Sequence, residues 1–201
     1  MNKQGLLYTV LFSFLVSFVF VAVLAIVNGS TAEQVALNLR LQRQRAILTA
    51  MGREAETQQE IESAYADVEI LEYDDTTLYR AQVAGRDIYA KEFVGAGLWG
   101  PIEGVLAVTG DFERAVGLEI VSHNETPGLG GRVAEEPFLS QFREERIVND
   151  NIVVGGAGSG DEDRENGTVD AITGASRTSD GMRVILDREL SVLASLIGGN
   201  S

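Results

Sequence analysis

The feature that most constrains this chain is an uncharged run of 22 residues, Leu6 to Val27, rich in Leu, Val and Phe. About 20 apolar residues in a helix cross the hydrocarbon core of a bilayer, so this run is long enough to span it. A cleaved signal peptide has a shorter apolar stretch and ends at a small-residue cleavage site, which we do not find here. The run therefore predicts a retained, single-pass membrane anchor.

The charges beside the anchor indicate which way it crosses. Lys3 lies before it, and Glu33 is the first charged residue after it. The excess of Lys and Arg on cytoplasmic flanks places the N-terminus inside and the following domain outside, although Arg40, Arg43 and Arg45 weaken this signal. We expect a protein of the inner membrane, with its domain on the periplasmic or outer side.

Composition excludes several classes of function. The net charge is -14, so the phosphates of a nucleic acid would be repelled. The chain has no cysteine and only one histidine, so a thiolate, an iron–sulfur cluster or a multi-histidine metal site cannot be built from it. The carboxylates within residues 155–166 depart from the ligand spacing of a calcium loop. We predict no metal site and no catalytic acid–base pair, so redox chemistry would require an organic cofactor.

After the anchor the pattern predicts an α+β protein of three parts: residues 1–28 as the anchor, 29–66 as a helical stalk or packing segment, and 67–201 as one domain. Thr31 is the expected N-cap of a helix that stops near Gly52, and residues 54–66 form a second helix. Strands are expected at residues 77–83, 87–93, 105–108, 116–122 and 152–154, and helices at residues 134–145 and 179–197.

Three glycine-containing segments carry polar or aromatic groups suited to a ligand. The first, residues 95–102, contains Leu98 and Trp99, the only tryptophan. Its glycines let the backbone approach a flat ligand, on which Trp99 could stack. A core position for Trp99 at a strand–loop junction is the reading that local sequence favours.

The second segment, residues 123–131, contains a turn signal in Pro127-Gly128. Polar side chains lie beside this turn. A lone histidine is more often a structural hydrogen-bonding group than a catalyst, and one Glu beside it defines no nucleophile–base pair. The candidate residues of this segment are His123, Glu125, Thr126, Pro127, Gly128 and Leu129.

The third segment, residues 170–179, directly precedes the closing helix. A helix N-terminus receives a phosphate well, and Arg177 could add charge. Alternatively, the segment is a plain connection in which Ser179 caps the helix. Its candidate residues are Asp170, Thr173, Gly174, Ala175, Ser176, Arg177, Thr178 and Ser179.

In this order, and behind an N-terminal anchor, the three segments resemble the FMN-binding domain of two related membrane complexes. These are the sodium-translocating NADH:quinone oxidoreductase (Nqr), through its C subunit, and the Rnf complex, through its G subunit. The resemblance runs from about Tyr89 to the final helix and rests on His-Asn-Glu-Thr-Pro-Gly-Leu-Gly and Asp-Ala-Ile-Thr-Gly-Ala-Ser-Arg-Thr-Ser. It implies an FMN-binding domain at residues 67–201 whose mixed or antiparallel sheet is flanked by helices.

The resemblance also implies a covalent cofactor. In the family, a flavin transferase joins the phosphate of FMN to the last hydroxyl of a motif like Asp-x-x-Ser/Thr-Gly-Ala-Thr/Ser. That hydroxyl corresponds to Ser176, where the family usually has threonine, and Thr178 is the fallback acceptor. The first and second segments would form the walls around the flavin ring.

The implied function is electron transfer within an ion-translocating, Nqr-type NADH:quinone reductase or an Rnf-type complex. Partners would be iron–sulfur and flavin subunits in the membrane. Gly-Leu-Trp and Leu-Gly-Gly-Arg slightly favour Nqr. The alternative is a stand-alone, membrane-tethered flavoprotein for extracellular electron transfer or redox sensing.

Overall fold

The computed structural model describes residues 3–74, 76–156, 158 and 160–198, which divide into two compact units, residues 1–40 and 41–201. The helices are α1 (Lys3–Ala50), α2 (Gln58–Tyr65), η1 (Gly130–Ala134), α3 (Glu136–Leu139), η2 (Ser140–Phe142) and α4 (Ser176–Gly198). The strands are β1 (Glu69–Tyr73), β2 (Thr76–Val83), β3 (Arg86–Ala96), β4 (Pro101–Thr109), β5 (Arg114–His123), β6 (Glu145–Arg146), β7 (Val153–Gly155) and β8 (Thr168–Asp170).

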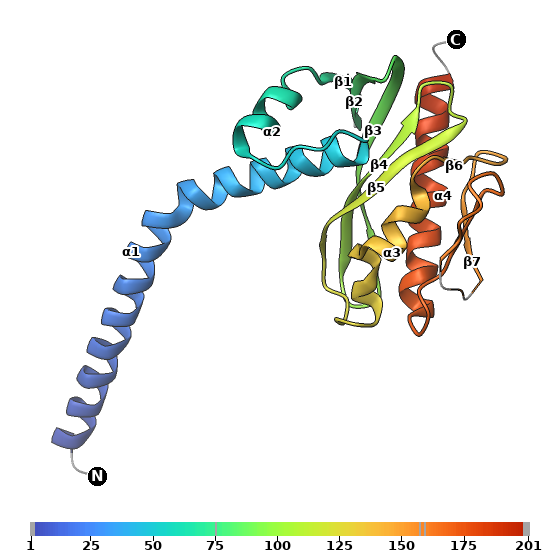
Figure 1. Ribbon diagram of the computed structural model, residues 1–201. Helices are drawn as coiled ribbons and strands as arrows, with labels where there is room; N and C mark the ends of the chain where they lie inside the picture. Colours follow the sequence, from blue (N-terminus) through green and yellow to red (C-terminus); the bar gives the residue numbers. More distant parts are fainter. Residues whose placement is uncertain (1–2, 75, 157, 159, 199–201) are drawn as a thin grey trace. The chain divides into compact units, whose positions relative to one another are not determined.

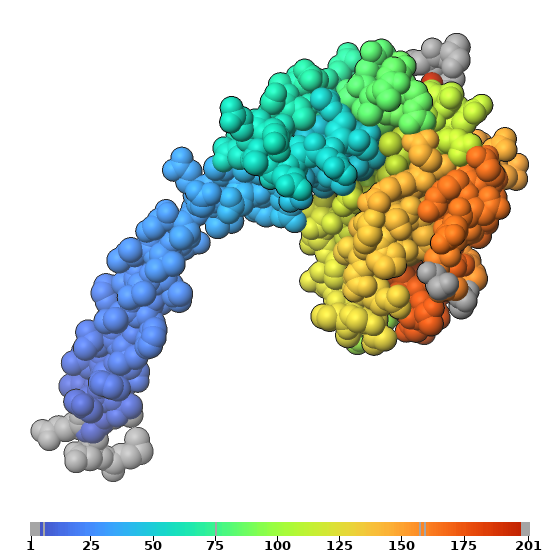
Figure 2. Space-filling view, in the orientation of Figure 1, coloured from blue at the N-terminus to red at the C-terminus, as the bar shows by residue number. Residues whose placement is uncertain are grey.

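The first unit is the apolar part of α1. Its most apolar 18-residue window has a mean hydropathy of 3.0, and none of that window is buried. Large apolar side chains of this helix, drawn in blue in Figure 2, are exposed, Leu7 and Ile26 among them at 70% each. Within the described residues, α1 is the one helix long and apolar enough to cross a membrane.

The expected helix start at Thr31 is wrong, because α1 continues through it without interruption. The Thr31 hydroxyl donates to the carbonyl of Val27, 2.9 Å away, instead of capping a new helix. A threonine hydroxyl that bonds back one turn is compatible with an uninterrupted helix.

The second unit is built on a six-stranded antiparallel sheet in the order β1-β2-β3-β4-β5-β6, so the predicted α+β class is confirmed (Figure 1). Both of its faces are covered. Along β4, Leu106 and Val108 belong to the core cluster that includes α4, whereas Val105 and Ala107 belong to the cluster formed with the end of α1 and with α2. Successive strand residues point to opposite faces, which is why this stretch of β4 is apolar at every position.

Two helix boundaries differ from expectation. The second helix begins at Gln58, where Thr57 and Glu60 form a reciprocal capping box. Residues 134–145 form not one helix but the three short pieces η1, α3 and η2, and Glu144 adopts a left-handed φ of 57° that no helix continues through.

Candidate functional site

A cleft of about 410 Å³ brings the three glycine-containing segments together. It lies where the β3–β4 loop, the segment after β5 and the first turn of α4 meet. Residues that line it are Leu98, Trp99, Glu125, Thr126, Leu129, Gly130, Gly174, Ala175, Ser176, Arg177 and Thr178. These segments are far apart in the sequence, so the fold assembles this cleft.

The first wall is the β3–β4 loop, which is closed by a hydrogen bond from the Gly97 amide to the Gly100 carbonyl, 2.9 Å long. Trp99 is 68% exposed and Leu98 46% exposed. The core position that local sequence favours for Trp99 is therefore wrong. The indole is an exposed apolar wall of the cleft, which suits contact with an aromatic ligand.

The second wall is the turn after β5. The Leu129 amide donates to the Thr126 carbonyl at 3.1 Å, and Gly128 has a φ of 72°, as the Pro-Gly signal predicts. Within this turn Thr126 and Leu129 reach the cleft, whereas Pro127 and Gly128 shape the turn without lining it. His123 also lies off the cleft: its Nδ1 accepts a hydrogen bond from the Glu125 amide at 3.2 Å.

The floor is the start of α4, which begins at Ser176. Gly174 enters it with a φ of 81°, a conformation that favours glycine. Ser176 and Arg177 are exposed. The first amides of a helix have no intrahelical acceptor, so they face an anion favourably.

Ser179 does not cap this helix, contrary to expectation. It is buried inside the first turn, where its hydroxyl accepts from the Ile172 amide at 3.0 Å and donates to the Ala175 carbonyl at 3.1 Å. Ser179 therefore stabilises the segment that leads into α4 and does not line the cleft.

Glu125 connects all three segments. Its Oε1 accepts from the amides of Leu98 and Trp99 at 2.7 and 3.0 Å, and its Oε2 accepts from the Thr178 hydroxyl at 2.6 Å. Burial raises the pKa of this carboxyl, but the bonds from Thr178 and the two amides outweigh burial and lower the pKa below its ordinary value. The side chain is 4% exposed and ionised at neutral pH.

Asp170 and Thr173 lie outside the cleft, in a neighbouring pocket of about 40 Å³. The Asp170 carboxylate accepts from the Gly160 amide at 3.1 Å, and the Thr173 hydroxyl donates to the Gly158 carbonyl at 3.3 Å. Both side chains thus connect the segment before α4 to the loop that contains Gly158 and Gly160.

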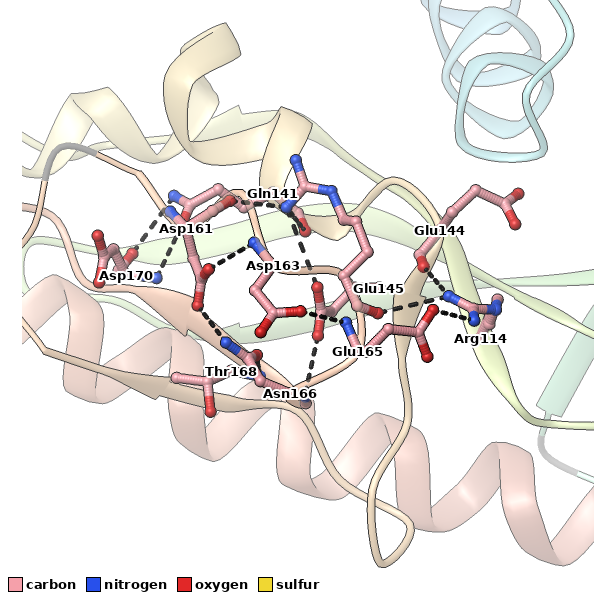
Figure 3. A network of polar contacts seen from close by, with 12 residues as sticks. Arg114, Gln141, Glu144, Glu145, Asp161, Asp163, Glu165, Asn166, Thr168 and Asp170 are labelled. Carbon is pink, nitrogen blue, oxygen red and sulfur yellow. Dashed lines mark hydrogen bonds and ion pairs between the residues drawn. The ribbon is translucent and has the colours of Figure 1, made fainter.

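Gln141, which was not predicted from the sequence, holds β8 and the loop before it (Figure 3). Its buried amide oxygen accepts from the backbone amides of Asp170 and Asp161 at 2.7 and 2.9 Å. Its amide nitrogen donates to the Pro137 carbonyl at 3.1 Å. A buried amide with these partners fixes the position of the backbone that it bonds. No local sequence motif indicates this role of Gln141.

Two carboxylates of the acidic loop before β8 hold the backbone of that loop (Figure 3). Asp161 accepts from the Asp163 amide at 2.8 Å, and Asp163 accepts from the Glu165 amide at 3.0 Å. Among the residues that the structure describes, no group of three or more His, Asp or Glu side chains is placed to hold a metal ion.

Glu145 makes stability depend on pH in the sense opposite to Glu125. It is fully buried; Oε1 accepts from the Gly167 amide at 2.9 Å, and Oε2 has no hydrogen-bond partner among the described residues. Burial raises the pKa of this carboxyl. The Gly167 amide and Arg164, which is 4.0 Å away, lower the pKa, but by less than burial raises it. A folded-state pKa above the unfolded value makes stability fall as pH rises from about 4.5 through the folded pKa.

We therefore expect Glu145→Gln to reduce the loss of thermal stability between pH 5 and pH 8. The amide keeps an acceptor for Gly167 and removes the buried charge. Thermal unfolding of the full chain in detergent micelles at several pH values measures this. The exposed Glu162→Gln is the matched control, and an unchanged pH slope in Glu145→Gln would contradict the assignment.

The chain is similar to known proteins in both sequence and fold. Residues 97–190 match the family model described as the FMN-binding domain, a range that includes both walls and the floor of the cleft. Two crystal structures share the fold: the C subunit of the Na⁺-translocating NADH-quinone reductase from Parabacteroides distasonis (TM-score 0.67, 23% identity, 81% of this chain and 94% of that one) and NqrC from Shewanella oneidensis (TM-score 0.67, 21% identity, 80% and 95%).

Two curated relatives are similar in sequence. The C subunit of the Na⁺-translocating NADH-quinone reductase of Vibrio anguillarum is 34% identical over 99 residues, which cover 46% of this chain and 37% of that one. The G subunit of the proton-translocating ferredoxin:NAD⁺ oxidoreductase complex of Clostridium ljungdahlii is 31% identical over 123 residues, 60% of this chain and 62% of that one. The matches thus span less than two thirds of either relative. Residues 97–190, from the exposed indole wall through the start of α4, are thus similar to the FMN-binding domain, and the chain is similar in sequence to the Nqr C subunit and the Rnf G subunit.

Proposed function

We propose that this chain is a membrane-anchored electron carrier that holds one FMN through a phosphoester on Ser176. The observation that carries the proposal is one juxtaposition. The exposed hydroxyl at the first residue of α4 lines the same cleft as the exposed Leu98 and Trp99. A phosphate would lie at the helix N-terminus, and a flat ring would lie against an apolar wall.

The described residues fit FMN in shape and charge. Leu98, Trp99 and Leu129 present apolar surface to the cleft, and Arg177 is the one cationic side chain among the lining residues. The first amides of α4 supply further positive potential for a phosphate. Bound FMN would supply the reversible storage of electrons that the chain's own side chains lack.

Ser176 suits the attachment better than Thr178. The Thr178 side chain is 1% exposed, and its hydroxyl already donates to Glu125, whereas Ser176 is exposed and makes no such bond. In the proposed step the Ser176 oxygen attacks the FMN phosphorus of FAD and a P–O bond forms. The pyrophosphate bond breaks, AMP leaves, and the hydroxyl proton passes to solvent or to the transferase.

Peptide mass spectrometry of protein isolated from its native host tests this. The peptide spanning Ser176 should be heavier by one FMN minus one water, with fragmentation that localises the adduct to Ser176. An unmodified peptide from that source would remove the covalent proposal. An adduct on Thr178 would keep the carrier and move the site.

The partners of the proposed carrier follow from its relatives. We propose that it transfers electrons between an iron–sulfur protein and a flavoprotein of the same membrane complex. The Nqr type is favoured by Gly-Leu-Trp at residues 97–99 and Leu-Gly-Gly-Arg at residues 129–132. Gentle detergent extraction should co-purify these partners and, during maturation, the transferase. Recovery of the chain alone from native membranes would instead favour the stand-alone flavoprotein.

We further propose that the domain faces the outer side of the inner membrane, as Lys3 and Glu33 indicate. The chain has no cysteine, so Ser191→Cys, at an exposed position of α4, gives a single labelling site. A membrane-impermeant maleimide should label this variant in intact spheroplasts. Labelling only after lysis would place the domain in the cytoplasm.

A further inference from the structure

Both oxygens of the Glu125 carboxylate accept hydrogen bonds from the protein itself. It joins the β3–β4 loop, 26 and 27 residues away in sequence, to Thr178, 53 residues away. Two backbone amides and a hydroxyl donate to one buried anion, and such charge-assisted bonds are the stronger kind. The chain itself therefore holds the carboxylate at both oxygens.

Glycines on both sides make the space for this carboxylate. A Cβ atom added at Gly97 would lie 2.5 Å from Glu125 Oε1, and one added at Gly130 would lie 2.5 Å from Oε2. Contacts that short do not occur for real Cβ atoms. The two walls of the cleft thus approach closely around a single side chain.

The β3–β4 loop has few hydrogen bonds of its own. Within the loop the described backbone contributes one hydrogen bond, from Gly97 to Gly100. Both of these residues are glycine, which gains more conformational freedom than other residues when a loop is released. The two amides beside the indole, those of Leu98 and Trp99, are both donated to Glu125.

We propose that Glu125 is a positioning residue that fixes the Gly97–Gly100 loop to the first turn of α4 and so holds the Trp99 wall of the cleft in place. The contacts that do this involve protein atoms alone, so the wall is ordered before a flavin arrives. Preordering lowers the conformational entropy lost on binding. This inference deepens the proposed function, and only its consequence for the flavin rests on that function.

The single tryptophan makes the proposal measurable in flavin-free protein. The full chain, produced without a flavin transferase and held in detergent micelles, has Trp99 as its only tryptophan fluorophore. Time-resolved fluorescence anisotropy then reports the motion of this loop on the nanosecond scale. In Glu125→Ala we expect the amplitude of the fast component to rise at least ~2-fold. The released loop would add its own nanosecond motion to that of the indole.

Conservative variants separate positioning from general loss of structure. Glu125→Gln keeps an oxygen for both amides and an NH₂ that can donate to Thr178, so its anisotropy decay should return close to that of the unmodified chain. Thr178→Val removes the bond to α4 alone and should give an intermediate fast component. If Glu125→Ala does not fold, this variant still tests the connection.

Glu189→Ala is the matched control. Glu189 is likewise buried, at 2% exposure, and pairs with Lys91 at 2.5 Å, but it makes no bond to the loop. Its loss destabilises the same sheet–helix contact without touching Trp99, so the fast component should stay unchanged. An equal rise in this control would reduce Glu125 to a general stability role.

Two failures remain distinguishable. A Glu125→Ala chain whose Trp99 anisotropy decay equals that of the unmodified chain overturns the positioning role, whatever the native peptide carries. An unmodified Ser176 peptide from the native host overturns the covalent cofactor and leaves the anisotropy result standing.

Discussion

Ser176→Ala is expected to abolish covalent flavin, which would appear as a dark band in a denaturing gel viewed for flavin fluorescence. The variant is produced together with the flavin transferase. The chain without any substitution, produced in the same way, provides the fluorescent reference. Ser176 is exposed at the first residue of α4, so its replacement leaves the packed core intact. Loss of the signal would then reflect loss of the acceptor oxygen and not loss of the fold.

Two matched variants complete the Ser176 experiment. Ser176→Thr retains a hydroxyl at the same position and should keep the fluorescence. Thr178→Val removes the buried hydroxyl that donates to Glu125 but leaves Ser176 in place, so it should also remain fluorescent. A fluorescent Ser176→Ala together with a dark Thr178→Val would assign the attachment to Thr178.

Gly130→Ala is expected to destabilise the protein through the contacts of Glu125. The new Cβ would lie 2.5 Å from Glu125 Oε2 and would press on the Thr178 hydroxyl that donates to that oxygen. Both groups are buried, so separating them leaves Oε2 of the carboxylate without its hydrogen-bond donor. Losing a buried hydrogen bond to a charged group costs about 1.5–3 kcal/mol, which for a chain of this size lowers Tm by roughly 3–12 °C.

Thermal unfolding of the full chain in micelles measures this difference. Gly155→Ala is the matched control, because a Cβ there would meet only a Val153 methyl group, at an ordinary 3.6 Å. Its Tm should shift by less than about 2 °C, as for a substitution within ±0.5 kcal/mol. Equal shifts in the two variants would show that the spacing around Glu125 is not what limits position 130.

The parts of the fold that sequence predicts are those with strong local patterns. Apolar runs and turn signals locate the inner strands, and the Pro127-Gly128 turn forms as predicted. The edge strand β6 has two residues and β8 has three, too few to show a period, and neither has an apolar run like the one that predicts β7, so neither is expected from the sequence.

The site was only partly predictable for a related physical reason. The three segments carry recognisable residue types, but the exposure of Trp99 depends on where the loop lies relative to α4, which no local pattern encodes. The contacts that place the loop and β8 pass through Glu125 and Gln141 to residues 26 to 53 positions away. Such contacts exist only once the chain is folded, so they have no signature in sequence spacing.

The two ends of the six-stranded sheet bear on how the protein behaves at high concentration. At one end, β1 presents Glu69 and Glu72 within a strand of five residues; at the other, β6 is only two residues long and exposes Arg146. Short, charged border strands are poor templates for intermolecular pairing. Like charge among copies, each carrying a net -14, adds repulsion. The ends of the sheet are therefore protected against intermolecular β-pairing when copies of the chain are concentrated.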